Sequence, residues 1–218
     1  MIKPLMLAAP IAAAIVLAGC STGMSSADYD KLAAEVTKAS FQDKNLVKVD
    51  RLIQDENMAL CSAAEVAGKP LDEKTTKAIE DAAMKTIKWP ADGKFLGDWK
   101  KGEAVAQSGR GSTWSDDAKV VNGGNCYNCH QIDKKEISYG TIGPSLYNYG
   151  KLRGVSDPTA EASKAIVEYT WGKLWNSQAY NACSHMPRAG HKGILSEAQL
   201  KDIMALLLDP KSPVNEQP

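Results

Sequence analysis

Cys126 to His130 form a Cys-x-x-Cys-His run, and no other motif in the chain is as specific. Each thiol can add to one vinyl group of a haem, and the histidine follows within the same helical turn, where its imidazole reaches the iron. A Cys-x-x-Cys pair also serves zinc sites and thioredoxin-like dithiols. The first needs a second pair of ligands and the second a βαβ setting, and the sequence predicts neither. The run therefore predicts the covalent attachment of one c-type haem.

His130 should donate its other ring nitrogen to an acceptor, because a metal-bound imidazole is held in orientation by that second contact. The carbonyl of Pro144 is our candidate. Proline has no amide hydrogen, so in the tight turn Gly143-Pro144 its carbonyl is a simple, fixed acceptor. The alternative is that these two residues only make a turn.

The opposite axial position of the iron has three candidate ligands, Met186, His185 and His191, all in one short loop. We favour Met186, because Pro187 and Gly190 flank it in a loop, where a fixed backbone can present a ligand. A thioether ligand raises the reduction potential and a second imidazole lowers it. A vacant position open to peroxide or oxygen is the remaining alternative.

The first 19 residues resemble an export signal, with one early charge at Lys3 and an apolar stretch too short to span a bilayer. They end in Leu-Ala-Gly before Cys20, as in the lipobox of bacterial lipoproteins, so we expect Cys20 to be acylated. Several acyl chains would tether the mature protein to a membrane without inserting it. A plain signal peptide cut elsewhere is the alternative. The predicted location is periplasmic.

Two of the five cysteines, Cys61 and Cys183, have no role in lipid or haem attachment. In an oxidising export compartment two such thiols are expected to form a disulfide. The alternative is a pair of buried free thiols, since sequence cannot show that the two Cα atoms come close enough.

Lys plus Arg and Asp plus Glu both number 26, so there is no basic excess for nucleic acid.

The sequence predicts an all-α fold, because no stretch alternates like a strand over any length. A tether from Ser21 to about Asp28 precedes the first helical patterns. One helix is expected over residues 49–61 with Cys61 near its end, and a second from an N-cap at Asp72 to Trp89-Pro90. Residues 20–95 are therefore interpreted as a tether and helical extension, which either forms a small subdomain or wraps around the core.

Residues 96–218 are interpreted as the haem domain. A helix is expected at 99–107, and another begins with Asp157-Pro158 as N-cap and first residue and continues through Leu174. Ser196 and Gln199 form a capping box for the last helix, which Asp209-Pro210 ends.

The order of haem motif, Gly-Pro turn and Met-Pro loop before a closing helix resembles class I cytochromes c. More narrowly, four segments are similar to SoxX, the family of monohaem cytochromes of the sulfur-oxidation system. These segments are Gly123-Gly-Asn-Cys-Tyr-Asn-Cys-His-Gln131, Gly140-Thr-Ile-Gly-Pro-Ser-Leu146, Tyr169-Thr-Trp-Gly-Lys173 and Met186-Pro-Arg188. The resemblance implies a class I fold, with Cys126 and Cys129 attached to haem and His130 and Met186 as axial ligands.

The resemblance also implies a complex with a SoxA-like cytochrome. That complex is an L-cysteine S-thiosulfotransferase that joins thiosulfate to a cysteine of the carrier protein SoxYZ and passes electrons to a downstream acceptor. In that family the SoxX haem is the relay, so this chain would not be catalytic alone. The extension and the lipobox depart from shorter family members. An independent, membrane-tethered electron carrier is the alternative function.

Overall fold

The computed structural model describes residues 23–117 and 119–215, so the predicted signal peptide and Cys20 lie outside the described residues. These residues form helices and loops without a β-sheet; Lys44 and Val47 make one isolated antiparallel bridge. The predicted all-α fold is confirmed. No helix among the described residues is long and apolar enough to cross a membrane.

The chain divides into two compact units after Asp43. The first unit contains α2 (Ser26–Ser40), which begins with a capping box between Ser25 and Asp28 and has no buried residue. The helix thus starts within the stretch predicted as a tether. All later elements belong to the second unit, so residues 44–95 lie in the same compact unit as the haem motif.

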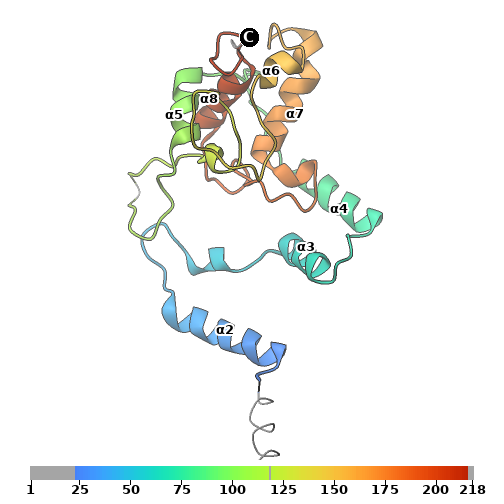
Figure 1. Cartoon of the computed structure of the whole chain (residues 1–218), viewed down its shortest axis with the longest axis vertical. Coiled ribbons are helices and arrows are strands. Elements are labelled where there is room, and N and C mark those ends of the chain that lie inside the picture. Colours follow the sequence, from blue (N-terminus) through green and yellow to red (C-terminus); the bar gives the residue numbers. More distant parts are fainter. Residues whose placement is uncertain (1–22, 118, 216–218) are drawn as a thin grey trace, which may run out of the picture. The chain divides into compact units, whose positions relative to one another are not determined.

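The core of the second unit is built by α5 (Trp99–Gln107), α7 (Lys164–Trp175) and α8 (Glu197–Leu208), which Figure 1 shows side by side. Gly102 on α5 lies directly against the backbone of α8, where an added Cβ would meet the carbonyl carbon of Asp202 at 2.6 Å. Trp171, Leu200 and Met204 are fully buried between the helices. Burial of such side chains is worth roughly 1.5–3 kcal/mol each.

Three helices begin where the sequence predicts, and each begins at a side-chain cap. The carboxylate of Asp98 accepts the Lys100 amide at the start of α5, whose bounds match the predicted 99–107. Asp72 caps α4 (Glu73–Met84), although α4 ends before the predicted stop at Trp89-Pro90. The capping box of Ser196 and Gln199 begins α8, and Asp209 ends it.

Two predicted helices differ from the structure. The expected helix over 49–61 is broken into η2 (Val49–Leu52) and α3 (Glu56–Val66), because Asp55 starts a new helix by accepting the Met58 amide. Cys61 therefore lies in the middle of α3, and Ile53, expected on a buried face, is 73% exposed.

The helix expected to start at Asp157-Pro158 begins later, at Lys164. The Asp157 carboxylate instead accepts hydrogen bonds from the amide and hydroxyl of Thr159, which close a turn. The short helices η4 (Glu161–Ser163), α6 (Tyr149–Leu152) and η5 (Ser177–Ala179) complete this part of the fold, and α4 packs against η5.

Candidate haem-binding site

The haem motif forms a tight turn. Residues Cys126–Asn128 are a 3-10 turn, η3, and the amides of Cys129 and His130 both donate to the carbonyl of Cys126, at 3.1 and 2.9 Å. The preceding loop is also closely packed: a Cβ on Gly124 would meet Cys126 Sγ at 3.0 Å and Leu195 at 3.6 Å. The motif is therefore a compact turn against the end of the loop that carries Met186.

His130 is oriented by the Gly143-Pro144 turn. Its Nδ1 lies 2.7 Å from the carbonyl oxygen of Pro144. Because a carbonyl can only accept, Nδ1 carries a proton, and in the neutral tautomer of this kind the lone pair available to a metal is on Nε2. Gly143 lies against the ring, since an added Cβ would come within 2.5 Å of Nδ1 and 2.7 Å of Nε2. The Gly143 amide in turn donates to the carbonyl of Cys129 at 2.8 Å.

The two motif cysteines are not bonded to each other. Burial raises the pKa of Cys126 to about 11, so the apoprotein holds a neutral thiol there at neutral pH. Among the described residues, no three His, Cys, Asp or Glu side chains gather as a metal site.

Met186 lies in the loop between η5 and α8 and packs against the same hydrophobic core as Cys126. Its backbone is held by Ser177, whose hydroxyl donates to the Met186 carbonyl at 2.6 Å, and by Ser184, whose hydroxyl accepts the Met186 amide at 3.3 Å. The other two candidates, His185 and His191, are exposed. Although the residue as a whole is exposed, desolvation of its ring, together with the charges of Lys192 and Arg188, lowers the pKa of His191.

A disulfide joins Cys61 on α3 to Cys183, three residues before Met186, with the Cα atoms 5.5 Å apart. The bond connects residues that are 122 positions apart in the chain. It links the N-terminal part of the second unit to the loop that presents Met186.

The surroundings of Trp175 indicate whether the site fits a haem. It stacks on Trp171, is 8% exposed and lies against Gly190 of the Met186 loop. Its indole Nε1 and Asn148 Oδ1 are the buried side-chain polar atoms without a hydrogen-bond partner among the described residues. Such a buried donor is costly unless an acceptor is bound. A haem supplies carboxylate acceptors on its propionates, so an unpaired donor next to the Met186 loop fits that group.

The residues that can hold haem c are thus Cys126 and Cys129 by covalent bonds, and His130 through Nε2, with Met186 on the same core. Haem supplies one-electron chemistry when it is bound. The chain's own residues would orient it, since the Pro144 carbonyl holds His130 through Nδ1.

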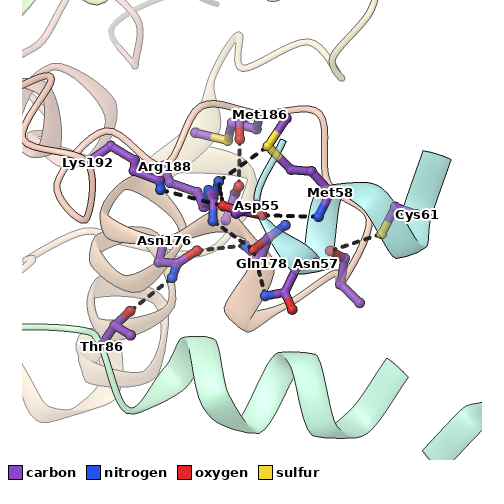
Figure 2. Close-up of polar contacts among 12 residues, drawn as sticks. Asp55, Asn57, Met58, Cys61, Thr86, Asn176, Gln178, Met186, Arg188 and Lys192 are labelled. Atoms are coloured by element: carbon purple, nitrogen blue, oxygen red, sulfur yellow. Dashed lines mark hydrogen bonds and ion pairs between the residues drawn. The ribbon is translucent and has the colours of Figure 1, made fainter. Parts of the chain in front are cut away.

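Sequence reasoning missed two features of this site. Trp175 gave no signal beyond an ordinary aromatic residue on a helix. An ion pair between Arg188 and Asp55, 133 residues apart, also went unnoticed, because neither charge is distinctive alone. Figure 2 shows this pair at the centre of a network that links α3 to the Met186 loop.

Comparisons with known proteins agree with the geometry. Residues 110–210 match the family model of cytochrome c. An uncharacterized lipoprotein of Aquifex aeolicus (strain VF5) is 33% identical over 196 residues, which cover 85% of each protein. Cytochrome c domains carry covalently bound haem c and transfer electrons. The chain is therefore a cytochrome c-type electron carrier, and it belongs to the same family as this Aquifex lipoprotein.

Proposed function

We propose that this cytochrome is the electron relay of a thiosulfate-oxidising complex of the SoxAX type. The observation that carries the proposal is where the four SoxX-like segments lie. One residue from each, Tyr127, Leu146, Trp171 and Met186, contributes to a single hydrophobic core around the haem motif. The resemblance thus includes residues that share one core with the haem motif, whereas Ile142 and Tyr169 of the same segments are exposed.

The cysteines support a relay without catalysis by this chain. Sulfur transfer requires an accessible, reactive thiolate. Among the described residues, Cys61 and Cys183 are bonded to each other, and Cys126 and Cys129 belong to the haem motif. The reactive cysteine is therefore expected on a SoxA-like partner.

The relay role also satisfies the electron balance of the reaction. Joining thiosulfate to the thiol of a SoxYZ-type carrier forms one S–S bond and releases the thiol proton and two electrons. A single haem takes one electron at a time, so it must pass the first to a downstream acceptor before it accepts the second.

We further propose that the mature chain is tethered outside the cytoplasm through acyl groups on Cys20. The lipobox before Cys20 and the lipoprotein relative support this. Mass spectrometry of the membrane-extracted protein should find Cys20 acylated at the mature N-terminus. An unmodified Cys20 within a signal cut at another residue would contradict the tether.

The function is tested by expressing the chain with and without the SoxA-like protein from the same genome. Thiosulfate-dependent reduction of this haem, in the presence of the carrier protein, should require the partner. Replacing both Cys126 and Cys129 by Ala should remove the electron outlet while leaving the partner intact. Equal activity of the isolated chain, lost on Cys183→Ser, would overturn the relay.

An independent, tethered electron carrier is the second candidate. It is favoured by the lipoprotein relative, because a tether keeps a carrier close to membrane-bound donors and acceptors. Failure to co-purify with any SoxA-like protein, together with rapid electron exchange with a membrane oxidase, would favour this alternative.

A further inference from the structure

The loop that presents Met186 is held by a part of the chain more than one hundred residues earlier. We use "ligand loop" for residues 183–191. The disulfide from Cys61 holds its first residue, and the Asp55 carboxylate contacts Arg188, two residues after Met186. Both attachments come from α3 and its N-cap, and Figure 2 shows the one that Asp55 makes.

The ion pair between Asp55 and Arg188 is the shorter of two charge contacts to the loop region. Arg188 Nη2 lies 2.5 Å from Asp55 Oδ2, and Lys192 Nζ lies 3.5 Å from the same oxygen. The side chain of Arg188 is only 12% exposed and that of Asp55 33%. Because the pair is partly shielded from water, removing one partner leaves the other charge poorly solvated, which costs more than losing an ordinary surface pair.

Gln178 extends the network to the backbone of the loop (Figure 2). Its side-chain oxygen accepts hydrogen bonds from Arg188 at 3.2 Å and from Asn57 on α3 at 3.4 Å. Gln178 is buried next to Ser177, the residue whose hydroxyl donates to the Met186 carbonyl. Arg188 is thus fixed by α3 and by the same short helix that fixes Met186.

Met58 makes a further contact with Arg188. It lies one turn into α3, where Asp55 accepts its amide, and its sulfur lies 3.5 Å from Arg188 Nη2. One carboxylate therefore starts α3 and binds the loop at the same time. A shift of α3 would move both attachments of the ligand loop together.

We propose that α3 with its N-cap is a clamp that positions Met186 toward the haem iron, and that Asp55 and Arg188 are its positioning residues. The inference rests on the proposed ligation of Met186. A thioether is a neutral ligand on a flexible side chain. Its hold on the iron depends on a backbone that is already in place, because a preorganised loop loses little entropy on coordination.

The clamp predicts that weakening either attachment frees Met186 from the iron more often. Two variants test this in the full-length haem protein: Asp55→Asn, which keeps an N-cap acceptor but removes the charge, and the pair Cys61→Ser with Cys183→Ser. Asp72→Asn is the matched control, because Asp72 caps α4 in the same manner. Met186→Ala is the reference for complete loss of the ligand.

The measurements are imidazole binding to the ferric protein, the haem reduction potential, and hydrogen exchange of the ligand-loop amides. Both clamp variants should bind imidazole about tenfold more tightly than the wild type, equivalent to about 1.4 kcal/mol, and should exchange loop amides faster. The control should match the wild type in all three. The two attachments are removed in separate variants, and hydrogen exchange is measured on each of them. Poor folding of one variant therefore leaves the other variant to decide the result.

Two negative results have different meanings. If Met186→Ala increases imidazole binding but both clamp variants bind it like the wild type, the clamp is overturned and the ligand assignment stands. If Met186→Ala itself changes neither imidazole binding nor potential, the ligand assignment fails and the clamp fails with it.

Discussion

Replacing Gly143 by alanine should disturb the haem through His130, without touching a covalent attachment. An added Cβ would come within 2.2 Å of His130 Cε1, while ordinary contact begins at 3.4 Å, so the ring must move by about 1.2 Å. The bond from Nδ1 to the Pro144 carbonyl, now 2.7 Å, would then lengthen to as much as about 3.9 Å. At that length it is no longer a hydrogen bond.

Loss of this bond should raise the reduction potential. A hydrogen bond from Nδ1 makes the imidazole a stronger donor and so stabilises ferric iron. A neutral hydrogen bond is worth about 0.5–1.5 kcal/mol, and for a one-electron couple about 59 mV corresponds to a tenfold change. The expected rise is therefore about 20–60 mV.

The assay is a redox titration of protein whose covalent haem has been verified by denaturing gel. Gly109→Ala is the control, because an added Cβ there would meet only the flexible side chain of Asn125, at 3.3 Å or more. A Gly143→Ala protein with covalent haem and the wild-type potential would refute the reasoning that this glycine and Pro144 set the orientation of His130.

Three further predictions concern the ligand and the core. Met186→Ala should lower the potential by more than about 60 mV, because a thioether favours ferrous iron; a titration that gives the wild-type potential would exclude it as a ligand. Replacing Cys61 and Cys183 by Ser should lower the free energy of unfolding by up to about 5 kcal/mol, measured by denaturant titration; equal stability would show that the bond does not constrain the unfolded chain. Gly102→Ala should lower the melting temperature despite alanine's higher helix propensity, because overpacking costs about 1–3 kcal/mol; a higher melting temperature would show that α5 and α8 can separate freely.

Features of the fold that depend on residues close together in the sequence could be predicted from the sequence. The bounds of α5 and the capping box of α8 follow from side chains that bond amides two or three residues away. The same kind of signal was misleading at Asp157. A carboxylate can close a turn as readily as it can cap a helix, and here it bonds Thr159 within a turn.

The break between η2 and α3 shows a second limit. Apolar residues at 49, 52, 53 and 60 suggested one continuous buried face, yet Ile53 is largely exposed. Asp55 decides the break, because it starts a new helix and also contacts Arg188. The first role could have been found from local sequence. The second depends on tertiary structure, since nothing near Asp55 identifies a partner 133 residues away.

The chain supplies the residues on the two sides of the haem in different ways. Cys126, Cys129 and His130 lie within five residues, so one turn would fix the predicted covalent attachments and the predicted first axial ligand. The proposed second ligand lies 56 residues after His130, and its position depends on the rest of the fold. Its loop is also where the disulfide and the Arg188 ion pair act. Residues 44–66 would then contribute to the haem potential, and a mutation in this segment should be examined first by redox titration and only then by partner binding.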